Sequence, residues 1–335
     1  MTESKTICIA GASGLVGANL TKAALERGYR VRGTLRDSSD TEKTRHLYAL
    51  AGAPERLELL GADMSHPGAF DEALSNADAV FIACLIPTYF GPSGKPAREM
   101  DDEQGEKEIV MPTVAGCLNI LRSAYDAGIK DAIICSSTSS TNPKNPVEKK
   151  NEIDHWSDRA HQYAQKKYTS AAKTVMEAAA MEFAAHNNIR LSIFLPTLML
   201  GPAVLPEHAE GGFQGMLRNM LQGGAPRHDK IPNDSSSMIH VQDLALLFLA
   251  AYESPEASGR YFGVYDSWHY KDIYAELEKL IPEAQMPEPL IEQPLPPTGF
   301  DFTRRDSLGV SLRDVPTILK ETVESLRNGA VKLSG

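Results

Sequence analysis

Three glycines at positions 11, 14 and 17 follow an apolar run over residues 7–10, and helical spacing begins directly after them. The pattern predicts a strand, a tight turn and the N-terminus of a helix. Gly11 allows the turn, Gly14 leaves room for a pyrophosphate beside bare backbone N–H groups, and Gly17 lets the helix pack closely on the sheet. The spacing G-x-x-G-x-x-G could also be a turn without a ligand, but its place between strand and helix favours a dinucleotide site.

The second predicted strand, residues 29–36, ends in basic rather than acidic side chains. An Asp or Glu at its tip would accept hydrogen bonds from the adenosine ribose and favour NAD, whereas an Arg can pair with a 2′-phosphate. We therefore predict NADP (NADPH) as the cofactor, with Arg36 as the main phosphate ligand and Arg32 and Lys43 as helpers. Solvated surface charge is the competing interpretation, and it is stronger for Arg32 and Lys43 than for Arg36.

Short aliphatic segments alternate with helical segments through the first half of the chain. Residues 57–63, 79–83 and 132–136 are predicted strands, and each follows a predicted helix. Continuous apolar strands separated by helices indicate a parallel sheet covered on both faces. We therefore predict an α/β fold with a Rossmann-type doubly wound parallel sheet, whose ligands bind at the carboxyl ends of the strands. Asp63 would contact the adenine amino group or cap a helix.

Glycine and proline become frequent beyond residue 200 and divide short helices and loops. We predict an NADP-binding domain over residues 1–198 and a smaller C-terminal substrate lobe over residues 199–335. Residues 238–253 would pack back on the first domain, and we expect structural roles for His240 and Asp243 within them.

The composition limits the class of partner. The chain carries a net charge of −10, which argues against nucleic acid. Its longest apolar stretches, 191–200 and 244–251, are too short to span a bilayer, and residues 1–5 carry no apolar signal segment. We therefore expect no membrane contact and a cytoplasmic location. The four cysteines lie in apolar runs without metal-ligand spacing, which predicts buried thiols and no metal site.

Hydroxyl side chains crowd the end of the strand predicted at 132–136. Residues 136–141 read Ser-Ser-Thr-Ser-Ser-Thr, and open α/β sheets place their chemistry at such strand ends. The helical segment predicted over 163–185 carries Tyr163, Lys167, Tyr168 and Lys173. A polar turn and a solvated lysine face are the alternatives, but a hydroxyl-rich strand end with a Tyr/Lys helix is the combination to test for catalysis.

Several stretches together resemble the extended short-chain dehydrogenase/reductase superfamily, and within it the dihydroflavonol reductase and cinnamoyl-CoA reductase-like group. They occur in the family's order: GASGLVG (11–17), VRGTLRD (31–37), FDEA (70–73), PTVAG (112–116), KTVME (173–177), PTLMLGP (196–202) and HVQDLA (240–245). In such enzymes a Tyr donates the proton to a carbonyl oxygen as NADPH delivers hydride to its carbon, and a Lys four residues later holds the nicotinamide ribose. A Ser or Thr polarises the carbonyl, and the resemblance implies Thr138 in that role, with Ser137 beside it.

The resemblance leaves two candidate Tyr/Lys pairs. Tyr163 and Lys167 have the i, i+4 spacing that places both on one helical face. However, the stretch that leads into the next strand aligns without a gap when Lys173 is the family lysine, and this leaves Thr169 at the Tyr position. Tyr168 would then lie about 140° from Lys173 on an α-helix, and a one-residue π-bulge would realign them, so we favour Tyr168 with Lys173. The third alternative is a chain that binds NADP but has lost efficient proton transfer.

The predicted site includes further residues at the strand ends. For the cofactor we predict contacts with Gly11, Ser13, Gly14, Leu15, Val16, Gly17, Arg36, Lys43, Asp63, Met64, Ala83, Cys84, Pro196, Thr197 and Leu198. A Pro- and Gly-rich loop after residue 84 would cover the site. Apolar side chains there and in the lobe would line an adaptable substrate pocket, namely Leu85, Tyr89, Phe90, Met199, Phe213 and Met216. Aromatic residues that fix the loop to the body, and a lobe core around residues 213–216, are the alternatives.

These features favour an NADPH-dependent reductase of an aldehyde or ketone on a small, largely apolar or aromatic molecule, in reversible alcohol dehydrogenase chemistry. The alternative enzyme is a sugar-nucleotide epimerase or dehydratase of the same superfamily. Arg36 and the scarcity of basic residues in the substrate loops argue against this alternative. From another class, a non-catalytic NADP-binding sensor or scaffold would explain the displaced Tyr. We expect a monomer or a homodimer.

Overall fold

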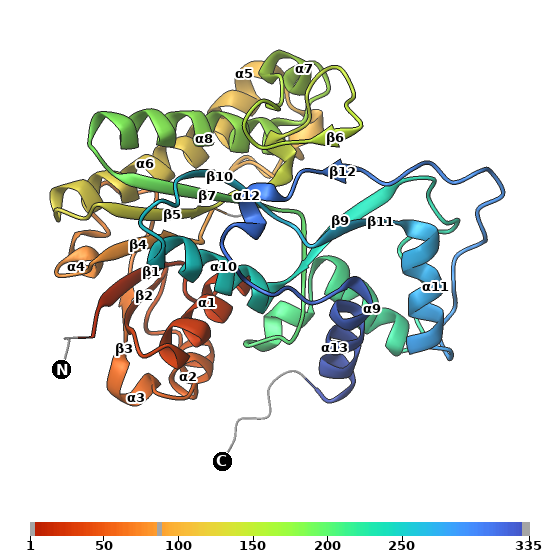
Figure 1. Cartoon of the computed structure of the whole chain (residues 1–335), viewed down its shortest axis with the longest axis horizontal. Coiled ribbons are helices and arrows are strands. Elements are labelled where there is room, and N and C mark those ends of the chain that lie inside the picture. Colours follow the sequence, from red (N-terminus) through yellow and green to blue (C-terminus); the bar gives the residue numbers. More distant parts are fainter. Residues whose placement is uncertain (1–3, 86–88, 330–335) are drawn as a thin grey trace.

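The computed structural model describes residues 4–85 and 89–329. A seven-stranded parallel sheet forms its centre, in the order β10-β7-β5-β4-β1-β2-β3 (Figure 1). Its strands are β1 Thr6–Ala10, β2 Arg30–Leu35, β3 Leu57–Gly61, β4 Ala79–Ile82, β5 Asp131–Cys135, β7 Arg190–Pro196 and β10 Gly259–Gly263. From β1 the chain adds β2 and β3 on one side and β4, β5, β7 and β10 on the other. The sheet is therefore doubly wound, as the alternating sequence pattern predicts. The prediction omits β10, which pairs with β7.

Helices cover both faces of this sheet. On one face α1 (Leu15–Glu26) packs against α10 (Val241–Glu253), and on the other α6 (Met111–Asp126) packs against α8 (Tyr168–His186), as Figure 1 shows. Shorter helices and turns complete this part: α2 Thr41–Tyr48, α3 Ala53–Arg56, α4 Asp71–Leu74, η1 Ala97–Glu99, α5 Asp102–Gly105, η2 Glu106–Val110, η3 Thr138–Ser140 and α7 Arg159–Ala164. Residues 102–126 form three consecutive helical segments, α5, the π-helical η2 and α6.

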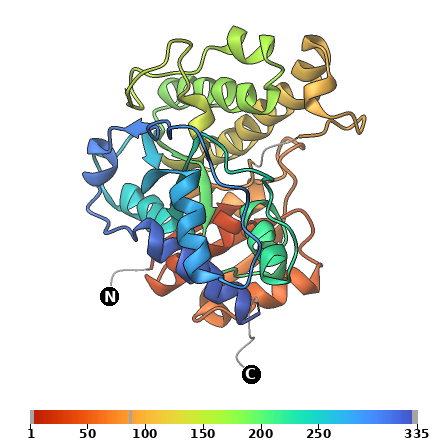
Figure 2. The same cartoon turned by 90° about the vertical axis from the view of Figure 1, so that its right-hand side faces the viewer.

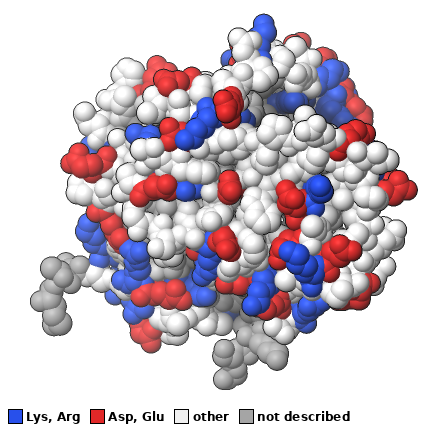
Figure 3. Space-filling model, turned by 45° about the vertical axis from the view of Figure 1, so that its right-hand side comes forward, with Lys and Arg blue, Asp and Glu red and all other residues white. Residues whose placement is uncertain are grey.

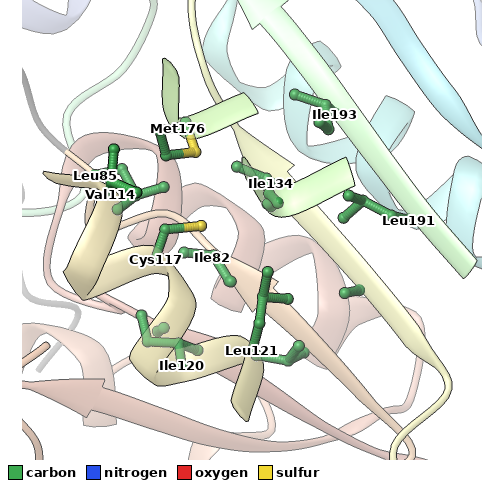
Figure 4. Packing of buried hydrophobic residues seen from close by; sticks show 14 of the residues in the cluster. Ile82, Leu85, Val114, Cys117, Ile120, Leu121, Ile134, Met176, Leu191 and Ile193 are labelled. Carbon is green, nitrogen blue, oxygen red and sulfur yellow. The ribbon is translucent and has the colours of Figure 1, made fainter. Parts of the chain in front are cut away.

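Alternate side chains of each buried strand enter different cores. In β1, Ile7 belongs to the cluster beneath α1 and α10, whereas Cys8 belongs to the cluster beneath α6 and α8. Figure 4 shows the second cluster, in which Cys117 of α6 and Met176 of α8 approach Ile134 of β5. Two apolar faces on one sheet explain why the strands are continuously apolar in sequence.

A smaller lobe lies at one end of the molecule (Figures 1 and 2). It contains a three-stranded sheet of β8 (Leu198–Leu200), β9 (Ser235–His240) and β11 (Asp266–His269). Helices α9 (Gly212–Leu221), α11 (Tyr270–Leu280) and α13 (Val315–Arg327) enclose a third apolar core with this sheet. The turns η4 (Pro206–Ala209) and α12 (Thr303–Asp306), and the pair β6 (Lys149–Lys150) and β12 (Gly299–Phe300), complete the structure.

The helix predicted over 163–185 is interrupted before Tyr168. Lys166 has a positive φ of 53°, its N–H donates to the carbonyl of Tyr163 at 2.8 Å, and the N–H of Lys167 donates to the carbonyl of Gln162 at 2.9 Å. These two bonds form a Schellman motif, which ends α7 and allows the chain to begin α8 in a new direction.

No helix in the described ranges combines the length and the hydropathy that a bilayer crossing requires. On the face drawn in Figure 3, acidic and basic side chains are interspersed.

Candidate active site

The glycine turn connects β1 to α1. Gly11 adopts a φ of +86°, a conformation that favours glycine. A Cβ on Gly11 would lie 2.9 Å from the backbone of Cys84, and a Cβ on Gly17 would lie 2.0 Å from the carbonyl oxygen of Gly11. These two glycines are therefore required by the packing of the turn itself.

Gly14 has a different role, because its surroundings leave room for a side chain. A Cβ there would meet only the carbonyl oxygen of Gly11, at 3.5 Å. Gly14 is the N-cap of α1, and within the described chain no side chain caps this helix and no acidic residue occupies its first turn. Its N–H groups and positive dipole are thus open to an anion, and the turn, which includes Ser13, Leu15 and Val16, fits a pyrophosphate.

Two basic side chains lie near the end of β2, where the adenosine half of a dinucleotide would bind. Arg36 is exposed directly after the strand. Lys43 in α2 lies 3.8 Å from a carboxylate oxygen of Asp40 and 3.6 Å from one of Glu207. Arg36 and Lys43 can therefore attract a 2′-phosphate, although Lys43 already lies beside the carboxylates of Asp40 and Glu207.

The prediction that Arg32 assists at this end is wrong. Its guanidinium donates to Glu58 at 2.8 Å and to the backbone carbonyl oxygens of Glu72 and Ser75 at 2.7 and 2.6 Å. These bonds hold β2 to β3 and to the end of α4, so the charge of Arg32 has a structural role.

Asp63 closes a turn after β3. Its carboxylate accepts hydrogen bonds from the N–H and the hydroxyl of Ser65, both at 2.8 Å, and these bonds lower the pKa of Asp63. Next to it, the carbonyl of Met64 accepts a 3.0 Å bond from the Asn119 amide. Asp63 thus stabilises a turn rather than a helix N-terminus, since no helix begins among the described residues between β3 and α4, and its contact with adenine stays a prediction.

The end of β4 forms the wall behind the glycine turn. The N–H of Ala83 donates to the carbonyl of Ala10 at 2.9 Å, and Cys84 lies against Gly11. The Cys84 thiol is kept protonated, since burial raises its pKa to about 12.

Hydroxyl groups at the end of β5 point to different partners. The Oγ1 atoms of Thr138 and Thr197 are 2.5 Å apart. Thr138 is 9% exposed, whereas Thr197 is open to solvent. Ser137 accepts a 3.2 Å bond from the N–H of Ser139 and caps η3. Ser137 is itself half-buried, so exposure does not separate the two hydroxyls, but only Thr138 is hydrogen-bonded to the exposed Thr197.

A buried ion pair supports this hydroxyl turn, and sequence reasoning missed it. Arg260 of β10 donates to Glu177 of α8 at 2.8 Å and to the Ser140 hydroxyl at 2.9 Å. Ser136 donates to the other oxygen of Glu177. Burial raises the pKa of Glu177, and the charge of Arg260 opposes that rise. The pair fixes the backbone on both sides of Thr138.

Lys173 extends from α8 toward the strand ends. Its side chain is 3% exposed, and its ammonium donates to the carbonyl oxygen of Leu85, just after β4. Burial lowers the pKa of Lys173. A buried cation is thus held between β4 and β5, beside the glycine turn.

Tyr168 does not pair with Lys173 in this structure. Its hydroxyl donates to Asp102 Oδ1 at 2.8 Å, and its ring lies where a side chain on Gly105 would be. The predicted π-bulge is wrong, because 168–186 is α-helical throughout, and the π-helical segment is η2 instead. With regular helix between them, Tyr168 and Lys173 stay about 140° apart. Burial, with the neighbouring Asp102, raises the pKa of Tyr168 to about 12.

The alternative pair is also not formed. Tyr163 donates to Glu106, and Arg159 binds the same carboxylate at 2.9 Å. Lys167 is exposed on the far side of the Schellman motif. Because the helix is interrupted between Tyr163 and Lys167, the i, i+4 spacing does not place them on one face.

The predicted substrate residues are not all brought together. Leu85 is buried beneath the site, and Tyr89 and Phe90 are 66% and 60% exposed at the start of the loop. Met199 packs against the core beneath α1 and α10. Phe213 and Met216, predicted to line the pocket, are 7% and 8% exposed in the core of the lobe, which is the alternative that their helical spacing allowed.

A second contact that sequence reasoning missed joins the lobe to the glycine turn. His208 of η4 lies with Nε2 at 2.9 Å from the carbonyl of Ser13. Its Nδ1 accepts a 3.3 Å bond from the N–H of Leu205, so the proton is on Nε2. Nothing in the sequence near either residue indicates a contact across 195 positions.

The chain is similar to known proteins over most of its length. A model of the NAD dependent epimerase/dehydratase family matches residues 7–264. Dihydroflavonol 4-reductase from Callistephus chinensis is 30% identical over 330 residues, which cover 96% of this chain and 86% of that protein. Cinnamoyl-CoA reductase CAD2 from Medicago truncatula is 30% identical over 329 residues, which cover 96% and 95%.

Solved structures share the fold. Vestitone reductase from alfalfa superimposes with a TM-score of 0.77 at 22% identity, over 96% of this chain and 98% of that one. Yeast methylglyoxal/isovaleraldehyde reductase Gre2, complexed with NADPH, gives 0.77 at 20% identity, over 97% and 98%. From the family model and the relatives of matching length, we conclude that this chain belongs to the NAD dependent epimerase/dehydratase family.

Proposed function

We propose that this protein is an NADPH-dependent reductase of an aldehyde or ketone group on a small, largely apolar or aromatic molecule. The observation that carries the proposal is the position of three groups: the open glycine turn after β1, the Lys173 ammonium on the Leu85 carbonyl after β4, and the Thr138 hydroxyl after β5. Because the carboxyl ends of the neighbouring strands β1, β4 and β5 lie side by side, we expect these groups to lie near one another at this edge of the sheet. The reductase names of the relatives support this reaction class.

The chain offers residues for each part of the cofactor. The uncapped N-terminus of α1 would hold the pyrophosphate, and Arg36 and Lys43 would hold the 2′-phosphate. Thr197 and its neighbours Pro196 and Leu198 would border the nicotinamide. When bound, NADPH supplies a hydride to the carbonyl carbon. That the yeast relative was solved with NADPH supports the choice of cofactor.

The chain's own residues would orient the carbonyl and deliver a proton to its oxygen. The Thr138 hydroxyl would donate to that oxygen, and Thr197, 2.5 Å away and exposed, would return the proton from solvent. The buried Lys173 ammonium would stabilise the negative charge that develops on the oxygen. The phenol of Tyr168 has no part in this route, since Asp102 holds it.

One observation favours a second candidate, a protein that binds NADP without turnover. Thr169 stands four residues before Lys173, at the position where the resembling family carries its Tyr. Without a phenol there, proton transfer to a carbonyl depends on weaker acids.

The two candidates are separated by NADPH oxidation with purified protein and a panel of apolar, aromatic and aliphatic aldehydes and ketones, with sugar nucleotides as a separate set. The reductase proposal expects NADPH loss with carbonyl compounds. Tight NADPH binding with no turnover of any compound would support the second candidate, and turnover of sugar nucleotides alone would contradict both.

A further inference from the structure

The turn η4 lies over the cofactor end of the molecule although it follows the lobe strand β8. His208 contacts the carbonyl of Ser13 inside the glycine turn at 2.9 Å. The adjacent Glu207 reaches α2, where its carboxylate lies 3.6 Å from the ammonium of Lys43. Two consecutive residues of one short segment thus contact both regions that a dinucleotide phosphate would occupy.

The His208 contact fixes the position of η4. Both ring nitrogens have partners, since Nε2 donates to Ser13 and Nδ1 accepts from the N–H of Leu205. Burial lowers the pKa of His208, and His46 of α2 acts in the same direction, whereas Glu207 opposes it. An accepting Nδ1 and a donating Nε2 are those of a neutral ring, and the two bonds hold η4, which carries Glu207, against the glycine turn.

The surroundings of Lys43 are more acidic than a phosphate site requires. Its ammonium lies between Asp40, at 3.8 Å, and Glu207, at 3.6 Å. Asp40 has another function, because it caps α2 by accepting a bond from the N–H of Lys43 at 3.2 Å. Glu207 has no such bond among the described residues, and 43% of its side chain is exposed. Its carboxylate can therefore leave Lys43 without loss to the fold.

We propose that Glu207 sets the affinity of this protein for 2′-phosphorylated dinucleotides by competing with the 2′-phosphate for Lys43. Without ligand, Glu207 neutralises Lys43. A 2′-phosphate takes over the ammonium and displaces the carboxylate. The inference rests on the proposed use of NADPH and names Glu207 as the residue that weakens it.

The test is binding rather than turnover. NADPH, NADH, 2′,5′-ADP and 5′-AMP are titrated into wild type and Glu207→Gln by calorimetry. Glu207→Gln should tighten NADPH and 2′,5′-ADP about two- to fivefold, the range that an exposed ion pair of this kind can supply, and leave NADH and 5′-AMP unchanged. Glu42→Gln is the matched control, because Glu42 lies beside Lys43 on α2, is exposed, and pairs with Arg45 instead.

A double-mutant cycle tests the competition itself. In a Lys43→Met background, Glu207→Gln should no longer change 2′,5′-ADP affinity, since the carboxylate then has no cation to occupy. An unchanged NADPH affinity in Glu207→Gln, an equal change for NADH, or a full effect in the Lys43→Met background would each overturn the inference while leaving the reductase proposal intact. Wild type that binds no NADPH would overturn the cofactor proposal and this inference together, whereas binding without carbonyl turnover would contradict only the reductase.

Discussion

The phenol of Tyr168 donates a 2.8 Å hydrogen bond to Oδ1 of Asp102, in the first turn of α5, and not toward Lys173 of its own helix. The ring is fully buried and occupies the space that Gly105 leaves open. A tyrosine that the sequence offers as a proton donor therefore attaches the start of α8 to α5. The residues that we propose for proton transfer and charge stabilisation are therefore the strand-end hydroxyls and Lys173.

Tyr168→Phe should lower the free energy of unfolding by about 1 kcal/mol, because one buried hydrogen bond is lost and Asp102 loses its donor. Urea denaturation measures this change. Tyr163→Phe is the control: its hydroxyl also binds a carboxylate, Glu106, but at a partly exposed site where Arg159 remains as a partner. A Tyr163→Phe loss equal to that of Tyr168→Phe would contradict the attachment role.

Lys173→Met should reduce carbonyl turnover by about 100-fold or more, since the ammonium is the buried positive charge of the proposed site. Stability should change little, because the loss of the bond to the Leu85 carbonyl is offset by the removal of a buried charge. Steady-state kinetics and urea denaturation of the same preparation check both points. Lys167→Met, at an exposed position, should change neither quantity; unchanged turnover in Lys173→Met would remove Lys173 from the site.

Gly14→Ala and Gly17→Ala should separate ligand binding from folding. An alanine Cβ fits at Gly14 but would lie 2.0 Å from a backbone oxygen at Gly17. We expect Gly14→Ala to keep its unfolding free energy within about 0.5 kcal/mol and to weaken NADPH at least about tenfold, because the methyl group occupies the pyrophosphate space. Gly17→Ala should lose about 2 kcal/mol or more of stability. Unchanged NADPH affinity in Gly14→Ala would argue against a pyrophosphate there.

His240 should make the protein less stable as the pH falls. Burial, with the neighbouring charge of Arg313, lowers its pKa from 6.5 to about 3, and its Nδ1 accepts bonds from Arg313 and from the N–H of Gln242. Below pH 6.5 the unfolded chain binds a proton that the folded chain does not, so this contribution is present above that pH and is lost toward pH 3. The loss is at most about 1.4 kcal/mol per pH unit.

His240→Asn tests this dependence, since asparagine can also cap α10 but does not titrate. The free energy of unfolding, measured between about pH 4 and pH 7, should depend less steeply on pH in the variant than in wild type. The difference in slope corresponds to the uptake of up to one proton on unfolding. Parallel curves for the two proteins would contradict the assignment.

Local patterns were enough to predict the glycine turn, the alternation of strands and helices, and the basic end of β2. These features depend on residues close together in sequence, such as Gly11, Gly14 and Arg36 in β1 to β2. The doubly wound order follows from the same alternation, because parallel strands need helical connections.

The contacts that position the site residues join parts of the chain that are distant in sequence, and no local sequence pattern predicts them. Tyr168 binds Asp102 across 66 positions, Glu177 binds Arg260 across 83, and His208 approaches Ser13 across 195. The helix break before Tyr168 was equally hidden, since its left-handed residue is Lys166 rather than glycine or asparagine. Periodicity therefore predicted one long helix, and the resemblance, with a π-bulge added, assigned Tyr168 the wrong partner.

The proton route through Thr138 is tested by the kcat of NADPH oxidation with the best carbonyl compound of the panel, compared across wild type, Thr138→Val, Thr138→Ser and Tyr168→Phe. We predict that Thr138→Val loses about 100-fold or more, as expected for a group that transfers the proton, while Thr138→Ser and Tyr168→Phe stay within about threefold of wild type. A collapse of kcat in Tyr168→Phe, with Thr138→Val little changed, would contradict it and return the proton to the phenol.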